Sequence, residues 1–254
     1  MMNMMKLTRS GRVAVLTIAH GHANAIDLEF CADFTARLEE CRAPDISALV
    51  ITGQGRIFSA GVDLLRVIDG GADYVRAFLP ALGRVFDALF SFEKPVVAAI
   101  NGHAIAGGCI LACAADRRFI AQTATIGVPE LLVGVPFPVV ALEILRFAAS
   151  PQHVQSLVYG GAALAADAAV AHGLADAAVE PVALPRRAQT TAEALAAIPA
   201  AAFATTKQRL REPTLQRIRH AAPDVDPAVV DAWASPETLR AIREYVERTF
   251  KKPS

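Results

Sequence analysis

Two short stretches of the chain place small residues where the backbone could stabilise negative charge on a substrate oxygen. ITGQGRIFSAGVDL begins at Ile51 and INGHAIAGGC begins at Ile100, and each starts at the end of an apolar run. Glycine and alanine let a backbone N–H approach a ligand closely, and the second stretch also opens a predicted helix whose N-terminus favours negative charge. Two amides aimed at one point would form an oxyanion hole, although glycines after strands are also common in plain turns.

Several other catalytic and binding motifs are excluded by residue type. GQGRIFSAG carries Phe58 where a dinucleotide-binding loop needs glycine, and Ser59 lacks the glycine two positions earlier that a nucleophile elbow requires. The chain contains no GK[ST] of a phosphate-binding loop, and its histidines and cysteines show no spacing typical of metal ligands. We therefore expect no nucleotide-binding loop, no serine nucleophile and no metal site.

Predicted strands alternate with predicted helices along the first half of the chain. Apolar or alternating runs predict strands at residues 12–19, 47–53, 95–100 and 117–121. The spacing of apolar residues predicts helices at residues 28–42, with Asp27 as the N-cap, and at residues 74–92. Strands and helices at these distances indicate right-handed crossovers and a largely parallel sheet in an α/β fold.

The second half of the chain is predicted to be mostly helical. Helices are expected at residues 139–148, 151–159, 164–172, 184–197, 201–211 and 236–251. We expect a core in residues 1–195 and a helical C-terminal region in residues 196–254, both within one structural unit.

Composition and charge narrow the classes of partner. The 25 basic and 25 acidic residues cancel, so no overall field favours nucleic acid or an anionic membrane. The uncharged run at residues 95–115 is long enough to span a bilayer, but Asn101, Gly102 and His103 interrupt it, so we expect a buried strand and helix instead. A hydrophobic share of 54% predicts surfaces that are buried between subunits.

The cysteines and the N-terminus bear on cellular location. The four cysteines are expected to be buried free thiols, which are typical of a reducing compartment. The N-terminal residues MMNMMKLTR contain no apolar segment of the kind found in secretory signals. We therefore expect a cytoplasmic location.

Four segments of the chain occur in a specific order and spacing. They are NAID from Asn24, FSAGVDL at residues 58–64, EKPVVAAINGHAIAGGC at 93–109 and ADRRFIAQTATIGVPELLVG at 115–134. This arrangement resembles that of the crotonase superfamily, the enoyl-CoA hydratase/isomerase family, over about residues 12–185. The resemblance implies an α/β fold built as a crotonase-like spiral of ββα units, with a helical C-terminal trimerisation region and assembly as a homotrimer or a dimer of trimers.

The same resemblance implies a substrate and a set of site residues. The substrate would be an acyl-CoA thioester, with coenzyme A as part of the substrate and no separate cofactor. Family motif positions assign the oxyanion-hole amides to Val62 and Gly107 and the catalytic carboxylate to Glu130 of the PE dipeptide. By the same resemblance, substrate contacts are expected from Ala23, Asn24, Ala25, Ser59, Ala60, Gly61, Asp63, Leu64, Gly108 and Ile110.

One position departs from the hydratase pattern of the family. Hydratases carry a second glutamate shortly after the glycine run, where this chain has Ile110. Isoleucine cannot hold or deprotonate water, whereas moving a double bond from the 3,4 to the 2,3 position needs only one carboxylate. The motifs therefore resemble those of mitochondrial-type Δ3,Δ2-enoyl-CoA isomerases. An enoyl-CoA hydratase or another crotonase-type lyase, and a non-catalytic acyl-CoA-binding protein, are the alternatives.

Other polar residues near these motifs are expected to have ordinary structural roles. Asp63 would cap a loop, Asp116 would fix a turn, and His103 would be a hydrogen-bonded loop histidine. A basic group near the C-terminus could contact the phosphates of coenzyme A, but a solvated helix face is the expected role of Lys207, Arg209, Arg211, Arg217 and Arg219.

Overall fold

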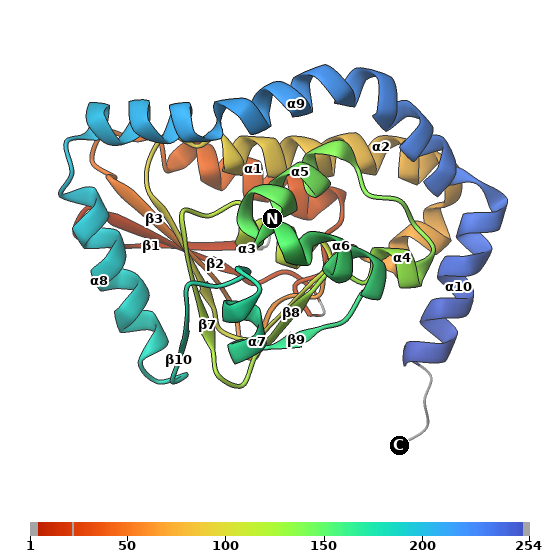
Figure 1. The fold of residues 1–254 in the computed structure, drawn as a ribbon, viewed down its shortest axis with the longest axis horizontal. Helices are drawn as coiled ribbons and strands as arrows, with labels where there is room; N and C mark the ends of the chain where they lie inside the picture. Colours follow the sequence, from red (N-terminus) through yellow and green to blue (C-terminus); the bar gives the residue numbers. More distant parts are fainter. Residues whose placement is uncertain (1–4, 22, 251–254) are drawn as a thin grey trace.

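The larger of two sheets has six strands and is almost entirely parallel (Figure 1). The computed structural model describes residues 5–21 and 23–250. Only the first two strands form an antiparallel hairpin, and all other neighbours pair in parallel. The strands lie in the order β1 (Met5–Ser10), β2 (Val13–Ile18), β3 (Ala48–Gly53), β5 (Val96–Ile100), β7 (Arg117–Ala121) and β10 (Ala177–Val179).

Helices cover this sheet because its strands are too apolar to face water. Every residue of β5 is buried, and β3 is buried at all but one position. The helix α8 (Leu184–Ala196) packs across β2, β3, β5 and β7, while α1 (Leu28–Glu40) packs against α2 (Leu64–Phe90). Asp27 accepts a hydrogen bond from the Phe30 N–H and is the N-cap of α1, as predicted.

The second sheet is made of four short strands, and each of the first three is followed by a helix. Its order is β4 (Ile57–Ser59), β6 (His103–Ile105), β8 (Thr125–Gly127) and β9 (Leu164–Ala165). The first three pair in parallel, and each follows a strand of the larger sheet. After them come α2, α3 (Gly107–Cys113) and α4 (Glu130–Val133). The chain thus repeats a ββα unit, and the starts of three helices lie at the same edge of the small sheet.

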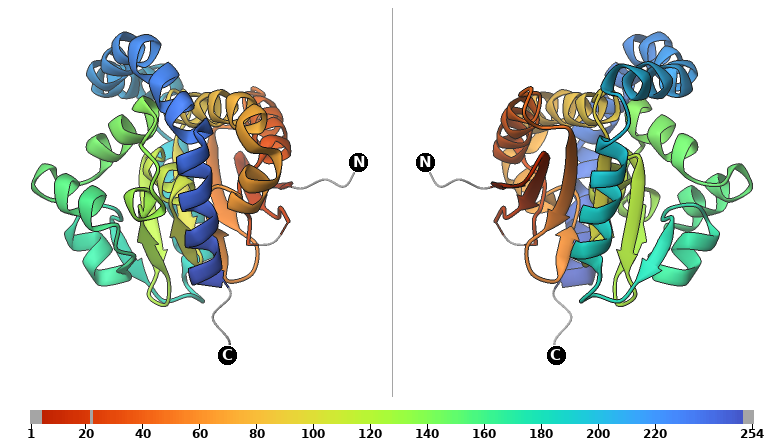
Figure 2. Two further views of the ribbon diagram at one scale, coloured as in Figure 1. Left: turned by 90° about the vertical axis from the view of Figure 1, so that its right-hand side faces the viewer. Right: turned by 90° about the vertical axis from the view of Figure 1, so that its left-hand side faces the viewer.

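The remaining helices form an outer layer. They are α5 (Val139–Ala148), α6 (Pro151–Gly160), α7 (Ala166–Ala171), α9 (Ala200–Ala234) and α10 (Pro236–Phe250). α9 lies along α2 and α5, and α10 turns back to pack against α2 and α4 (Figures 1 and 2). At the corner between them, Trp233 Nε1 donates a hydrogen bond of 2.8 Å to the carbonyl of Pro136.

Three predicted helix boundaries were wrong. α9 continues past Arg211 and contains three prolines, Pro213, Pro223 and Pro227, because apolar residues on its buried face hold it against the core beyond each lost hydrogen bond. α2 begins at Leu64 and is broken at Gly71, where φ is 58°, before it reaches the predicted start. The segment predicted as a helix at residues 164–172 starts with β9 instead. The predicted helix end at Lys251 lies outside the described residues.

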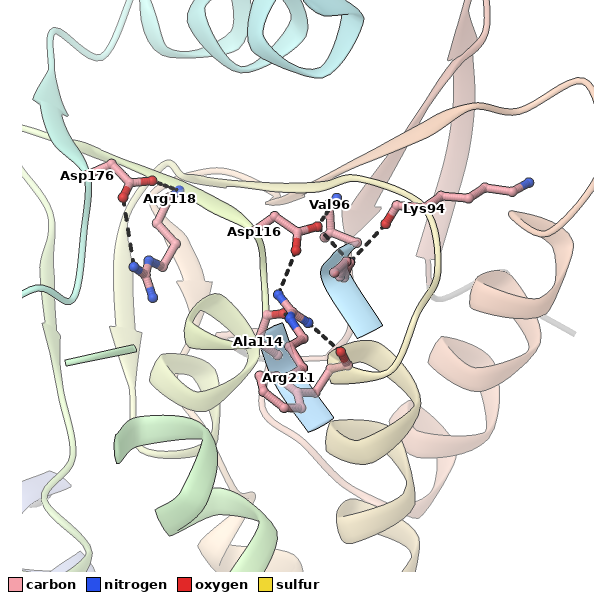
Figure 3. A network of polar contacts seen from close by, with 9 residues as sticks. Lys94, Val96, Ala114, Asp116, Arg118, Asp176 and Arg211 are labelled. Carbon is pink, nitrogen blue, oxygen red and sulfur yellow. Dashed lines mark hydrogen bonds and ion pairs between the residues drawn. The ribbon is translucent and has the colours of Figure 1, made fainter. Parts of the chain in front are cut away.

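Asp116, Lys207 and Arg211 form a buried polar cluster between α9 and the larger sheet, which Figure 3 shows from close by. Asp116 accepts hydrogen bonds from the Val96 N–H (2.7 Å), from Lys207 (2.6 Å) and from Arg211 (2.7 Å). The two cations also donate to the backbone carbonyls of Lys94, Phe90 and Ala114. Lys207 and Arg211 are therefore not part of a solvated helix face, because a carboxylate and three carbonyls replace their water.

Candidate active site

The backbone around Val62 is held by a short parallel bridge to Ile26. The Ile26 N–H donates to the Gly61 carbonyl at 2.7 Å, and the Asp63 N–H donates to the Ile26 carbonyl at 2.9 Å. Because N–H groups alternate in direction along an extended strand, the Val62 N–H points away from Ile26. Within the described part of the chain it donates to no backbone carbonyl, so it is free for a ligand.

The second predicted amide, that of Gly107, lies directly beside this segment. Gly107 is the first residue of α3, so its N–H has no partner inside the helix. Gly61 has φ +82°, and a Cβ placed on it would lie only 3.1 Å from the Gly107 nitrogen and 2.6 Å from the Ile105 carbonyl oxygen. The two glycine loops therefore touch, and the amides of Val62 and Gly107 are neighbours.

Ser59 and Gly108 hold the two loops together. A Cβ on Gly108 would be 2.3 Å from the Ser59 carbonyl oxygen, so only glycine fits at this contact. The buried Ser59 hydroxyl donates to the Asn24 carbonyl at 2.8 Å and accepts from the Gly61 N–H at 3.1 Å. Its hydrogen bonds are thus made within the protein.

Residues 23–25 form a third segment against the same loops. Asn24, at φ 53°, donates from its side chain to the Ile57 carbonyl at 3.0 Å. The Ala60 N–H donates to the Ala23 carbonyl at 3.0 Å. The neighbouring Ala25 is partly buried. The Asn24 side chain therefore holds the strand and loop at residues 57–61 in place.

Glu130 is a buried carboxylate that forms no ion pair with another described residue. It is the first residue of α4 and is 9% exposed, and among the described residues its Oε2 has no hydrogen-bond partner. Burial raises the pKa of Glu130 to about 8. A hydrogen bond to Cys113 and burial raise the pKa of Cys109 on α3, and the nearby charge of Glu130 raises it further. Glu130 therefore lies within electrostatic range of the helix that starts at Gly107, with a pKa suited to proton transfer near neutral pH.

The position after the glycine run is apolar. Ile110 is fully buried in α3, and the adjacent Leu111 is buried as well.

Asp63 accepts hydrogen bonds from the N–H groups of Leu65 and Arg66, both at 3.1 Å, and so caps α2 next to the partly buried Leu64. His103 is hydrogen-bonded to Thr125 at 2.8 Å. Asp63 is thus a capping residue as expected, at the start of a helix. His103 is hydrogen-bonded as expected, but it lies in β6 and not in a loop.

Two cavities lie away from these residues. One of about 370 Å³ is a surface cavity lined by the larger sheet, the residues before α8 and α8 itself, and one of about 260 Å³ is lined by α2, α5 and α9. Neither is lined by Val62, Gly107 or Glu130.

In residues 5–21 and 23–250 we find no cluster of three or more histidine, cysteine or acidic side chains that could hold a metal ion. That part of the chain also has no helix both long and apolar enough to cross a membrane.

The sequence was compared with known protein families and with curated proteins. Residues 8–252 match the family model described as enoyl-CoA hydratase/isomerase. The chain belongs to this family. A relative from Bacillus subtilis, named a probable enoyl-CoA hydratase, is 35% identical over 136 residues, which are 53% of each chain. The chain is thus a crotonase-superfamily enzyme, and its match to this relative spans about half of that relative's length.

Solved structures of the family have the same fold. A probable enoyl-CoA hydratase from Mycobacterium tuberculosis superposes with a TM-score of 0.82 at 30% identity, covering 95% of this chain and 99% of the other. Human mitochondrial Δ3-Δ2-enoyl-CoA isomerase superposes with a TM-score of 0.93 at 22% identity, covering 99% and 100%. The predicted crotonase spiral with a helical C-terminal region is confirmed.

Proposed function

We propose that this family member is a Δ3,Δ2-enoyl-CoA isomerase in which Glu130 is the only catalytic acid and base. The observation that carries the proposal is one buried carboxylate, with its pKa raised to about 8, whose charge acts on α3, the helix that begins at Gly107. The Gly107 and Val62 amides are neighbours, and neither donates to a backbone carbonyl within the described residues. The second carboxylate of the hydratases is replaced by the fully buried Ile110. The substrate is an unsaturated acyl-CoA thioester, and no separate cofactor takes part.

The reaction needs one proton to leave C2 and one to arrive at C4. The thioester oxygen accepts hydrogen bonds from the Val62 and Gly107 N–H groups. Ionised Glu130 then removes a proton from C2, and the negative charge moves onto that oxygen as an enolate. The electrons return through C2–C3, the double bond moves from C3–C4 to C2–C3, and Glu130 delivers its proton to C4. Each well-placed amide stabilises the enolate-like transition state by about 3 to 4 kcal/mol.

Burial of Glu130 and the apolar Ile110 both favour isomerisation over hydration. Adding water across C2–C3 requires a group that positions and deprotonates the water while a proton reaches C2. Ile110 offers neither an acceptor nor a base, and its side chain keeps the surroundings dry. The second candidate is an enoyl-CoA hydratase or another crotonase-type lyase, which the name of the Bacillus relative favours. A non-catalytic binding protein is the third, and the poised carboxylate argues against it.

We also propose a homotrimer or a dimer of trimers in the cytoplasm. Exposed apolar side chains on α9, such as Leu210 (67% exposed) and Val225 (43%), support burial of this helix between subunits. The four free, buried cysteines support a reducing compartment. Light scattering at micromolar concentration tests the assembly, and a monomer would contradict it.

Product-resolved assays test the proposed reaction. Purified protein is given 3-enoyl-CoA and 2-enoyl-CoA thioesters of several chain lengths, and isomer and 3-hydroxyacyl products are both quantified from each. We expect isomerisation to be at least about tenfold faster than hydration, a barrier difference of about 1.4 kcal/mol. Faster hydration at every chain length would replace the isomerase assignment by the hydratase.

Ile110→Glu, with Ile110→Gln as the matched neutral control, tests the role of the apolar position. A carboxylate at residue 110 near Glu130 could hold water between the two groups, so hydration should rise slightly above wild type. Two close carboxylates perturb each other and a buried charge destabilises the fold, so only a small gain is expected. Equal hydration by the Glu and Gln variants would show that residue 110 does not select the reaction.

A further inference from the structure

His20 and Asp27 close the loop that leads from β2 into α1. The His20 Nε2 lies 2.9 Å from the Asp27 Oδ1, and both residues are buried, at 6% and 9% exposure. A carboxylate only accepts hydrogen bonds, so Nε2 carries the hydrogen. The same Asp27 oxygen accepts the Phe30 N–H at 2.7 Å. This contact therefore fastens the beginning of the loop to the first turn of α1.

Residues 23 and 24, which lie between His20 and Asp27 in the sequence, have a strained backbone that needs support from other residues. Ala23 and Asn24 have φ values of 61° and 53°, in the left-handed region that non-glycine residues seldom adopt. Such conformations persist only where the surrounding contacts determine them. The His20 N–H donates to the Asn24 side chain at 3.0 Å, and the His20 ring stands edge-on to Phe30 with centroids 5.6 Å apart. His20 thus supports the loop through both its backbone and its ring.

This loop is also what positions the Val62 amide. Ala23 and Ile26 make the backbone hydrogen bonds to residues 60, 61 and 63 described above, and Asn24 accepts the Ser59 hydroxyl. Val62 lies in the middle of the clamped segment. A shift of the 23–26 segment would rotate the Val62 N–H relative to that of Gly107, whose position depends on α3 instead.

We propose that His20 is a positioning residue: through its hydrogen bond to Asp27 it holds the 23–26 loop against residues 59–63 and so aims the Val62 N–H at the thioester oxygen. This rests on the proposed function of Val62 as an oxyanion donor. His20 does not contact the reacting atoms. Its effect should therefore appear in transition-state stabilisation and carbonyl polarisation more than in acyl-CoA affinity.

Two amide variants of His20 differ only in reach and form a matched pair. In His20→Gln the side-chain nitrogen can occupy the position of Nε2 and donate to Asp27, whereas the shorter amide of His20→Asn reaches only the position of Nδ1. We expect His20→Asn to lower kcat on 3-enoyl-CoA about tenfold or more while KM changes less than about threefold. His20→Gln should recover most of the loss.

A spectroscopic measurement distinguishes positioning from general destabilisation. Isotope-edited infrared spectra of bound [1-¹³C]hexanoyl-CoA, which is saturated and cannot isomerise, report polarisation of the thioester carbonyl. In His20→Asn the shift of this band to lower frequency should be smaller than in wild type, and in His20→Gln it should be close to wild type. A full shift in a folded His20→Asn protein, or equal kcat losses in both variants, would overturn the proposal.

The outcomes also separate this proposal from the proposed function. If wild-type protein polarises the carbonyl but does not isomerise 3-enoyl-CoA, the isomerase assignment fails while the role of His20 is still decided by the infrared comparison. If wild-type protein does not polarise the carbonyl, the oxyanion hole and the role of His20 both fail. Should His20→Asn not fold, the shift in His20→Gln decides, because a donor at the Nε2 position must preserve it.

Discussion

Glu130 is a buried carboxylate and Asp116 a largely buried one, yet their surroundings are opposite. Asp116 receives hydrogen bonds from a backbone N–H and from two cations, Lys207 and Arg211. Among the described residues Glu130 forms no ion pair, and its Oε2 has no hydrogen-bond partner. The first arrangement stabilises the charged carboxylate and joins α9 to the ends of β5 and β7. The second destabilises the charged form and leaves a group that can take and release a proton.

The comparison shows that burial alone does not indicate which acidic residue is catalytic. Burial also lowers the pKa of Lys207 to about 8, even though the charge of Asp116 opposes this shift. A polar group whose hydrogen bonds are made within the protein fixes the structure around it. Figure 3 shows the contacts of Asp116 with its neighbours. A buried group left partly unpaired, next to free backbone donors, is the better candidate for chemistry.

The largest expected effect is on turnover. Glu130→Gln keeps the size of the side chain but removes the base, so isomerase kcat should fall by roughly 10² to 10⁴ while acyl-CoA binding stays near normal. Turnover and binding are measured by product-resolved assay and by calorimetry with a saturated acyl-CoA. A variant that keeps half of the wild-type rate would show that another residue carries the proton.

The pH dependence of wild-type enzyme sharpens this test. In the proposed reaction Glu130 must be ionised to remove the C2 proton, so kcat/KM should rise with pH and level off above about 8. A profile already flat from about pH 5 upwards would contradict the raised pKa of Glu130.

The next largest effect is on stability and concerns Asp116. In Asp116→Asn the buried cations Lys207 and Arg211 lose their counter-charge, which should lower the free energy of unfolding by about 3 to 5 kcal/mol. Urea titration measures this change, with Glu29→Gln as the control, because it also removes one carboxylate but at the exposed pair with Arg66. A loss below about 1 kcal/mol would mean that the cluster does not hold α9 in place.

Unlike the Asp116 carboxylate, which stabilises the fold, the ionised Glu130 carboxylate should destabilise it. Its pKa is about 8 in the folded protein against 4.5 for an ordinary glutamate, so folded protein binds a proton that unfolded protein has already released. The stability that Glu130 contributes is therefore full below about pH 4.5 and declines as the pH rises through 8. Glu130→Gln lacks this decline, and its stability relative to wild type should increase on the order of 5 kcal/mol between acidic and alkaline pH. If the urea midpoints of wild type and Glu130→Gln differed by the same amount at every pH in that range, the expectation would be refuted.

The smallest effect is expected for an acidic residue that is paired but exposed. Glu29 accepts two hydrogen bonds from Arg66, at 2.7 and 2.9 Å, on the surface between α1 and α2. Water screens such pairs, so Glu29→Gln should change the free energy of unfolding by less than about 1 kcal/mol, and less still at high salt. A loss as large as that of Asp116→Asn would show that pairing, and not burial, sets the size of the effect.

The parts of the fold that could be predicted are those specified locally. The strands at β5 and β7 were predictable because short apolar runs end at clear turn residues, and α1 because Asp27 precedes a helical pattern. α9 was not, because proline normally ends a helix, whereas contacts with α2 and α5 and the pairs with Asp116 hold α9 against the core. The burial of Lys207 was also hidden, since its partner Asp116 lies 91 positions away in sequence.

The candidate site was predictable only in part. The glycine stretches suggested backbone donors, but the family resemblance was needed to select Val62, Gly107 and Glu130. Their proximity depends on parallel pairing of β4, β6 and β8, which are only three residues long and carry no usable periodicity. His20 was missed because its partner Asp27 shows only an N-cap signal, and nothing in the sequence links the two.

The four buried cysteines can be used to measure local opening of the helices that contain them. Cys109 and Cys113 lie in α3, with their sulfurs 3.9 Å apart, while Cys31 and Cys41 lie in and at the end of α1. Burial raises the pKa of Cys31 to about 12 and that of Cys41 to about 11, so both thiols resist alkylation while α1 stays in place. The rate at which a thiol reagent labels each pair, resolved by mass spectrometry, would measure how often the two helices separate from the core. A saturated acyl-CoA that docks on the Gly107 amide should slow labelling of the α3 pair first.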